Sequence, residues 1–185
     1  MRRTHLALGL AAIAAATGSA LLTGCSAHPR RDPTGEEFPS VRATRLDGSE
    51  LELPAAGRGE PLLLLVGFEQ DAQFDLDRWL LGLAQAGVEV RAFEVPTIPG
   101  LIPGMISGTI DSGMRRGIPE EDWGAVATVY DDADRIARFT GNEDGLTGRI
   151  LLLDRDGRVV FFHDRGYSVG TLRRLQVALT ELRNG

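Results

Sequence analysis

A continuous apolar run at residues 61–68 constrains the fold more than any other feature of the sequence. It reads Pro-Leu-Leu-Leu-Leu-Val-Gly-Phe and contains no charged side chain. A strand that is buried on both faces needs such a run. The segment that follows, 75–86, is predicted to be a helix that Gly87 ends. Its apolar residues recur at helical spacing, which predicts a layered α/β domain: Leu76, Trp79, Leu80 and Leu83.

The rest of the chain alternates strands, turns and helices. Asp47-Gly48 and Asp156-Gly157 predict two hairpins, because both positions of such a pair tolerate the positive φ of a tight turn. The hairpin strands are expected at 41–46, 49–53, 150–154 and 158–162, two further strands at 88–95 and 126–130, and a short helix at 132–139. Ser168 is the expected N-cap of the last helix. The apolar face of that helix comprises Leu172, Leu175, Ala178, Leu179 and Leu182.

This order of elements, and two stretches of sequence, resemble a known family of domains. The stretches are VYDDADRIARFTG and RILLLDRDGRVVFFHDRG, followed by a terminal helix. They resemble the second half of peroxiredoxin-like and TlpA-like thioredoxin domains, and the resemblance covers 38–182 apart from 96–121. It implies an α/β thioredoxin-like fold, with a central mixed β-sheet flanked by helices and an extra helical insert around residues 97–121.

The redox site of that family has no counterpart in this chain. Redox members carry their cysteines at the first turn after the first core strand, which corresponds to residues near Gln73 and Leu76 here. Their cis-proline would fall near Gly148. The one cysteine of the chain is Cys25, and a thiolate is the attacking species in disulfide exchange. We therefore expect a redox-inactive domain with no catalytic residue and no cofactor.

The amino-terminal residues resemble a bacterial lipoprotein signal. Arg2 and Arg3 precede an uncharged apolar run at 6–22, which is the order of a secretory signal. An uncleaved anchor is the alternative, because the run approaches the ~18–20 apolar residues that span a bilayer. Leu22-Thr23-Gly24-Cys25 closely resembles the lipobox. That resemblance implies cleavage before Cys25 and acylation of its sulfur and its new amine, and several acyl chains anchor a protein stably.

The expected domain plan follows from this signal. Residues 1–24 are the lipoprotein signal peptide, 25–37 the lipidated N-terminus with a flexible polar tether, and 38–185 the thioredoxin-like domain. His28 is expected to be a solvated tether residue. We expect the protein in the cell envelope, attached to the membrane by its lipid anchor on the extracytoplasmic side. In a Gram-negative host this would be the periplasmic face of the outer membrane.

The net charge of the chain and its clusters of acidic side chains limit the classes of function that it can have. The chain has 20 basic residues, all arginine, against 26 acidic ones, and this net charge of −6 argues against nucleic-acid binding. Asp131, Asp132 and Asp134 could converge on a cation, although helix capping explains them better. Asp154–Gly157 is expected to be an exposed turn and His163 to bond with Asp164 at the surface. No metal site is expected.

The segment 96–121 lies outside a minimal thioredoxin domain. Its apolar residues recur every three or four positions, from Ile98 to Met114. Small residues recur every four positions and form a row: Gly100, Gly104, Gly108 and Ser112. Each internal glycine costs a helix roughly 1 kcal/mol relative to alanine, so the row indicates close packing or mobility. Two interpretations stay open: a helix that covers a sheet face, or an exposed element that docks to a partner or a bilayer surface.

The same segment resembles a second family, the mitochondrial ATP-synthase assembly factors, which are thioredoxin-like chaperones. The matching residues are Val95, Pro96, Ile98 and the run from Met114 to Glu120. The resemblance implies assembly of a membrane complex, with an envelope protein as client. The expected docking residues are Arg115, Arg116, Ile118, Met105 and Met114. The alternatives are a non-thiol, metal-dependent enzyme, a peroxiredoxin-like domain of unknown chemistry, and a structural lipoprotein without a client.

Overall fold

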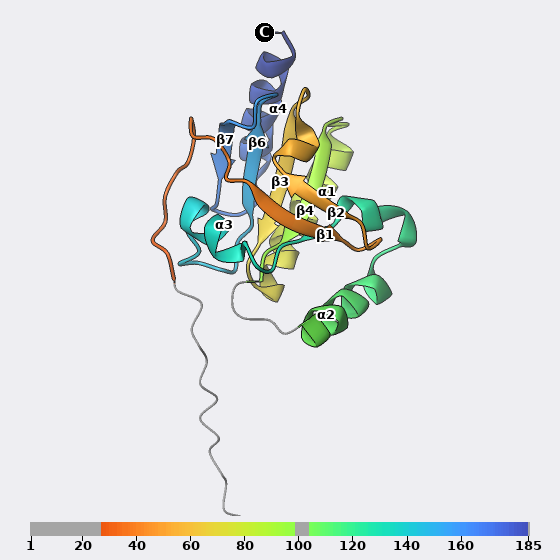
Figure 1. The fold of residues 1–185 in the computed structure, drawn as a ribbon. Coiled ribbons are helices and arrows are strands. Elements are labelled where there is room, and N and C mark those ends of the chain that lie inside the picture. The colour runs from red at the N-terminus through yellow and green to blue at the C-terminus, as the bar shows by residue number, and fades with distance from the viewer. Residues whose placement is uncertain (1–26, 99–103, 185) are drawn as a thin grey trace, which may run out of the picture.

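The computed structural model describes residues 27–98 and 104–184. A four-stranded mixed sheet lies at its centre (Figure 1). Strand β3 (Leu62–Gly67) runs parallel to β4 (Arg91–Pro96) and antiparallel to β6 (Arg149–Leu153), which pairs with β7 (Val159–His163). The residues Leu62–Val66 are at most 1% exposed. The prediction of a strand buried on both faces is therefore confirmed.

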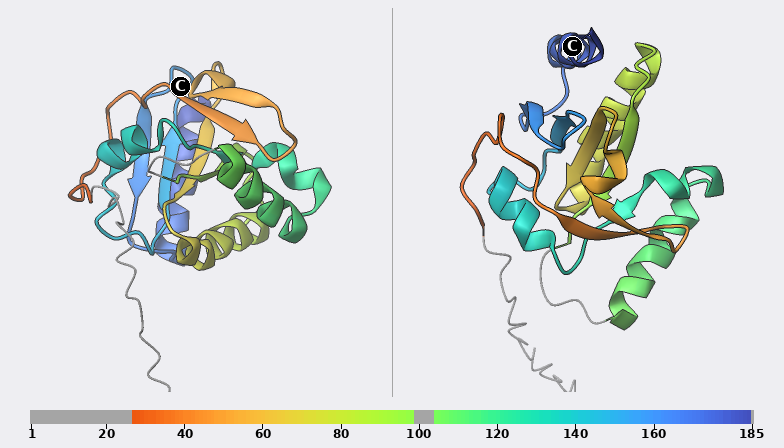
Figure 2. Two further views of the ribbon diagram at one scale, coloured as in Figure 1. Left: turned by 60° about the horizontal axis from the view of Figure 1, so that its bottom comes forward. Right: turned by 45° about the horizontal axis from the view of Figure 1, so that its top comes forward.

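The side chains of the central strands alternate between two core layers. On one face, α1 (Gln73–Gln85) and α4 (Val169–Asn184) pack on Leu63 and Leu65 of β3. On the other face, α3 (Ala133–Thr140) packs on Leu64. The central mixed sheet flanked by helices, as expected from the sequence, is confirmed (Figures 1 and 2).

A second sheet extends the first. Strand β1 (Val41–Arg45) pairs antiparallel with β2 (Glu50–Leu53) and with β5 (Ala127–Thr128). The segment 126–130 was expected to be a core strand, but only two of its residues form one. Isolated parallel bridges from Glu94 to Val126 and from Thr97 to Val129 join this sheet to the edge of β4. The chain around β5 therefore connects the two sheets.

Most local predictions agree with the structure, and the exceptions have simple causes. Gly48 and Gly157 have φ of 89° and 90°, as their hairpin turns require. The Ser168 hydroxyl accepts the Thr171 N–H at 3.1 Å and so caps α4. Leu80, predicted to face the core, is 38% exposed, because the core side of α1 is filled by Leu76, Trp79 and Leu83.

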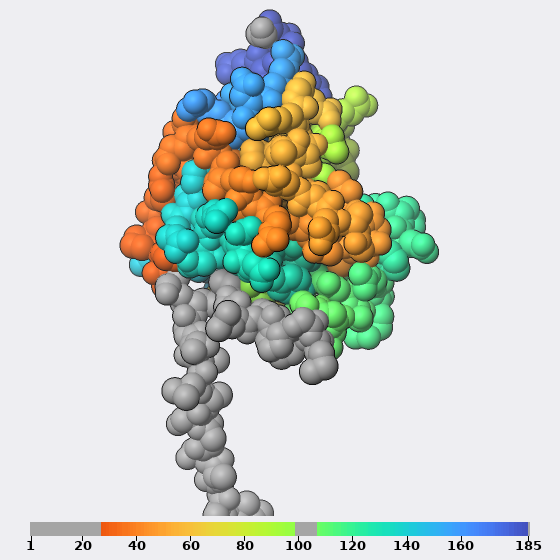
Figure 3. All heavy atoms as spheres, viewed as in Figure 1, coloured from red at the N-terminus to blue at the C-terminus, as the bar shows by residue number. Residues whose placement is uncertain are grey.

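The expected insert forms one helix, α2 (Gly104–Gly117), followed by the 3₁₀ segment η3 (Glu120–Ala125). Ile98 lies before the helix, and its N–H donates to the Val129 carbonyl at 3.0 Å, so the apolar stripe does not begin there. No side chain described in 107–117 is buried or belongs to either core layer. Figures 2 and 3 show α2 at the periphery. The interpretation of a helix that covers a sheet face is wrong for this part of the chain.

The prediction of a free tether is also wrong for residues 28–37, which we call the N-terminal strap. The Gly35 N–H donates to the Val159 carbonyl at 2.8 Å, and the Val159 N–H donates to Glu36 at 2.9 Å. The strap therefore pairs with the start of β7. The expected signal peptide, the lipobox and Cys25 lie outside the described residues. Within those residues, no helix combines the length and apolar character that crossing a bilayer requires.

Candidate functional site

The turn between β3 and α1 is closed by one carboxylate. Asp75 is 7% exposed, and its Oδ2 accepts the Gly148 N–H at 3.0 Å. Its Oδ1 accepts the Tyr167 N–H at 2.7 Å. A Cβ at Gly148 would lie 2.2 Å from Leu76 Cδ2, so these segments are in close contact. Asp75 therefore joins the start of α1 to the entry of β6 and to the chain before α4.

The structure brings together the three positions where the family resemblance expects redox residues. Gln73 is the first residue of α1, and its amide donates to Asp77 Oδ1 at 2.9 Å. Leu76 is in the core beside Gly148. An amide, a leucine and a glycine at this turn can position backbone, but they offer no nucleophile.

A partly buried carboxyl lies beside this turn. Burial raises the pKa of Glu94, and the nearby charge of Asp77 raises it further. A hydrogen bond with the Gln73 side chain lowers the pKa and only partly offsets the burial. No sequence pattern indicates this partly buried carboxyl, because Glu94 lies in an alternating strand where a glutamate is expected to be solvated.

Arg149 carries a buried charge close to the same turn. It is 2% exposed, its Nε donates to the Gly141 carbonyl at 3.0 Å, and its guanidinium lies 5.3 Å from the centre of the Phe68 ring. Burial lowers its pKa, while the charges of Asp164 and Asp144 raise it. These contacts hold the chain between α3 and β6 in place, and no ligand is needed to satisfy the arginine.

The strap contributes a second arginine to this region. Arg30 Nη2 donates to Asp164 Oδ1 at 2.6 Å, and the hydrogen bond to Asp164 raises the pKa of Arg30. Asp164 was expected to pair with His163, but the His163 Nε2 contacts the Gly166 carbonyl at 2.8 Å instead. Sequence analysis missed the Arg30–Asp164 pair, because nothing in a polar, proline-containing segment indicates a partner so far along the chain.

The expected docking residues are not equivalent in the structure. Arg115 donates from Nε to the Leu46 carbonyl at 2.6 Å, and its guanidinium lies 5.7 Å from the Trp123 ring. It therefore fastens α2 to the β1–β2 hairpin. Arg116 is exposed, whereas Met114 and Ile118 are half-buried. Met105 lies in α2, but its side chain is outside the described part of the structure.

A second contact holds α2 to the domain. The Tyr130 hydroxyl donates to Asp111 Oδ1 at 2.7 Å, and burial together with this bond raises the pKa of Tyr130. Tyr130 also borders a groove of about 400 Å³ on the outer face of the β1–β2 hairpin. The described side chains of α2, at 107–117, thus attach the helix through polar contacts, and none of them is a buried apolar residue.

Of the three aspartates considered for a cation, Asp132 and Asp134 bind other parts of the protein, and Asp131 is exposed. Asp132 accepts the Arg42 N–H at 2.9 Å, and Asp134 contacts His28 Nε2 at 2.9 Å. Asp154 Oδ1 accepts the N–H groups of its own turn, at 3.0 Å from Asp156 and 2.9 Å from Arg158. In residues 27–98 and 104–184, no three His, Cys, Asp or Glu side chains gather as a metal site would need.

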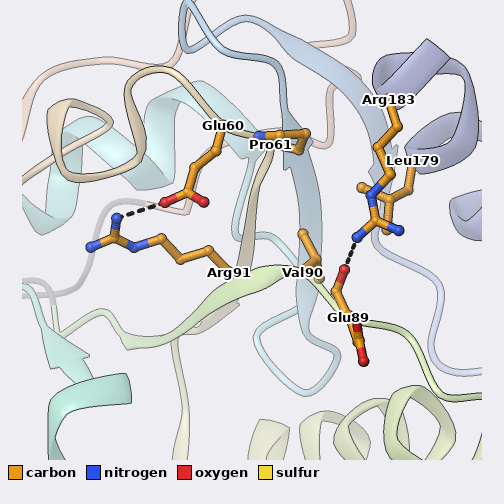
Figure 4. Close-up of a pocket in the computed structure, with 7 residues that line it drawn as sticks. All are labelled: Glu60, Pro61, Glu89, Val90, Arg91, Leu179 and Arg183. Carbon is orange, nitrogen blue, oxygen red and sulfur yellow. Dashed lines mark hydrogen bonds and ion pairs between the residues drawn. The ribbon is translucent and has the colours of Figure 1, made fainter.

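A further pocket of about 280 Å³ lies at the opposite end of β3 and β4 (Figure 4). Its two arginines are engaged with a carboxylate or with backbone. Arg91 Nη1 lies 2.8 Å from Glu60 Oε1, and Arg183 donates to the Glu89 carbonyl. The arginines of this pocket therefore brace the ends of β4 and α4.

Comparison with known proteins identifies the fold of the chain. Neither a protein-family model nor a curated protein sequence matches the chain. Solved structures do match. A SCO1/SenC family lipoprotein from Bacillus anthracis is 12% identical, with a TM-score of 0.53 over 84% of this chain and 99% of that one. The chain has a thioredoxin-like fold.

Two other thioredoxin-like neighbours show how far the likeness extends. BsSco, a member of the Sco family of cytochrome c oxidase assembly proteins, is 14% identical with a TM-score of 0.53, covering 84% of this chain and 98% of its own. A thiol peroxidase from Chromobacterium violaceum is 13% identical with a TM-score of 0.52, covering 82% and 90%. At such identities the likeness is one of fold alone, and the site must be argued from its own residues.

Proposed function

We propose that this protein is an exported lipoprotein, anchored at Cys25, that binds an envelope membrane protein and assists its assembly without thiol chemistry. The observation that carries the proposal is helix α2, an amphipathic helix whose described side chains are all left outside the core. A helix whose apolar stripe lies outside the core and stays partly exposed is a common docking element.

The docking surface, which we call the α2 surface, comprises Ile110, Met114, Arg116 and Ile118. The three apolar members follow at a spacing of four residues and are half-buried. Arg116 is exposed beside them and adds one positive charge. Arg115 is excluded from this surface because it is bound to Leu46 and Trp123.

The glycines of α2 support a helical partner. A Cβ at Gly108 or Gly117 would meet nothing within 4 Å, and one at Gly113 would meet only the end of Arg116, at 3.8 Å. These glycines therefore weaken the helix without allowing any close contact inside the protein. Small residues at helical spacing allow the backbone of another helix to approach closely. We infer that the client presents a helix to α2.

The absence of thiol chemistry rests on the turn after β3. Gln73 and Leu76 lie where the resemblance expects cysteines, and Asp75 uses its carboxylate to bind backbone. Lipid anchoring is supported by the lipobox resemblance and by the likeness to the Bacillus anthracis lipoprotein. Assembly of a membrane complex is supported by the likeness to BsSco and by the resemblance of 95–120 to assembly factors.

The test is co-purification from the native host in gentle detergent. The tagged full-length protein is compared with the Arg116→Glu variant. The matched charge control is Arg173→Glu, which changes an exposed side chain of α4. We expect one membrane protein in stoichiometric amount with the wild type and with Arg173→Glu, but not with Arg116→Glu. Recovery of the lipoprotein alone, or equal recovery with all three, would contradict docking through the α2 surface.

A further inference from the structure

The N-terminal strap is bound to the domain almost from its first described residue. His28 donates its N–H to Asn142 Oδ1 at 2.7 Å, and its carbonyl accepts the N–H groups of Asn142 and Glu143, both at 3.1 Å. Its ring contacts Asp134. Arg30 then forms the ion pair with the buried carboxylate of Asp164. The point where the chain leaves the domain is thus fixed beside the 142–146 loop.

The fold makes room for this attachment. Gly141 has φ of 73°, and a Cβ on it would lie 2.6 Å from the Pro29 carbonyl oxygen. Only glycine combines this backbone conformation with so close an approach. The strap is therefore part of the folded domain and does not act as a loose linker.

Chain geometry then limits the distance between the domain and its anchor. Only Ser26 and Ala27 separate Cys25 from His28. At about 3.3–3.6 Å per extended residue, the Cα atoms of Cys25 and His28 are at most about 11 Å apart. An acylated Cys25 sits at the bilayer interface, so the 142–146 loop beside His28 must lie close to the lipid.

We propose that the strap orients the anchored domain with one fixed face on the bilayer, an inference that rests on the proposed lipid anchor. This face, which we call the bilayer face, comprises the strap exit at His28, the 142–146 loop and the first turn of α1. It carries two exposed apolar side chains, Leu146 at 55% and Phe74 at 70% exposure. Such residues suit the apolar side of a bilayer interface.

The contacts within the bilayer face keep its parts together. Gly148 N–H binds Asp75, next to Phe74, and a Cβ at Gly145 would overlap the Glu69 carboxyl group. The loop is shaped by Asp144, whose Oδ1 accepts the Leu146 N–H at 3.0 Å. Leu146 and Phe74 therefore belong to one rigid end of the domain.

The charges of this face indicate how it meets lipid. Glu143 and Asp144 of the loop are acidic, as is the neighbouring Glu69, so these residues offer no electrostatic attraction to anionic headgroups. Contact must then depend on the acyl anchor, the strap and the apolar side chains of Leu146 and Phe74. Figure 1 shows the strap exit and α2 toward one end of the molecule and the end of α4 at the other. The same orientation brings α2 within reach of a client that is embedded in the membrane.

The experiment measures depth with single fluorophores on the acylated full-length protein in nanodiscs that contain headgroup-quencher lipids. Acylation blocks Cys25, so an introduced thiol is unique. Leu146→Cys is compared with Val177→Cys on α4, which is 58% exposed and serves as the matched apolar control. We expect several-fold stronger quenching at residue 146 than at residue 177.

A second variant tests the strap directly. A flexible Gly-Ser insertion between Ala27 and His28 leaves the domain and its acylation intact, and we expect it to abolish the difference between the two probes. Mass spectrometry of the N-terminus separates the two claims. A protein without acyl groups overturns both the lipid anchor and the orientation. An acylated protein with equal quenching at both positions, or with a difference that survives the insertion, overturns the orientation alone.

Discussion

The carboxylate of Asp75 binds the backbone N–H of Gly148 at 3.0 Å, across the place where redox members of this fold carry out their chemistry. The second oxygen of the same carboxylate binds Tyr167. The contact with Gly148 is buried and the contact with Tyr167 is partly buried, a setting in which hydrogen bonds to a charged acceptor are strong. The turn after β3 thus acts as a structural joint in this protein.

Replacing this carboxylate should therefore destabilise the domain. We expect Asp75→Ala to lower the free energy of unfolding by about 3 kcal/mol, because one buried and one partly buried N–H group lose their acceptor. Asp75→Asn keeps one carbonyl oxygen and should lose less. Urea unfolding of both variants measures the difference. Wild-type stability of Asp75→Ala would show that the joint is unimportant.

Glu94 predicts a pH dependence of stability. Burial raises its pKa in the folded protein, so folding favours the protonated carboxyl. This contribution is fully present below the unfolded pKa of about 4.3 and is lost as pH rises through the raised folded value. Glu94→Gln should therefore gain stability over the wild type at pH 7.5 and lose that advantage near pH 4.

The measurement is thermal unfolding at both pH values, with exposed Glu181→Gln as the control. The control should show no comparable gain at pH 7.5. A stability gain of Glu94→Gln that is larger near pH 4 than at pH 7.5 would contradict the conclusion that burial raises the pKa of Glu94.

Substitution of Gly108 should have opposite effects on the stability of α2 and on client binding. Its Cβ position is open, so Gly108→Ala is expected to stabilise α2 by up to about 1 kcal/mol. Slower amide hydrogen exchange in α2 would report this gain. The same methyl group should weaken client capture if a partner helix approaches there. A variant that gains stability and captures the client at wild-type level would argue against helix-on-helix docking.

Gly141 tests whether the strap is part of the fold. Gly141→Ala places a methyl group against the Pro29 carbonyl and strains a positive φ, at a cost of about 1–3 kcal/mol. We expect amide exchange to increase throughout 28–37. Gly48→Ala is the matched control, because Gly48 has φ of 89° but open space around its Cβ position. Equal exchange of the strap in both variants would contradict the proposed fit.

The sequence was most informative where one local pattern determines the structure. The apolar run at 62–66, the Asp-Gly turns and the Ser168 cap each gave the correct element, because a buried strand, a tight turn and a helix start have local requirements. The place of the turn after β3 was also correct, since the family resemblance fixes the element order.

The errors concern contacts between distant parts of the chain. A polar segment such as 28–37 predicts a tether, but its pairing with Asp134, Asn142 and Asp164 depends on the folded surface. Arg115 likewise was expected to dock a partner, because it is a basic residue beside an apolar stripe. Its hydrogen-bond acceptor is the Leu46 carbonyl in a distant hairpin. Periodicity can describe the face of a helix, but it cannot show what that face meets.

Site-specific photo-crosslinking in the native host tests client binding at the α2 surface most directly. A photoreactive amino acid replaces Met114 on the α2 surface or, as the control, Val177 on α4. We expect one membrane-protein adduct from position 114, lost when Arg116→Glu is added, and no such adduct from position 177. No adduct at 114, or the same adduct from both positions, would contradict a client-binding role for α2.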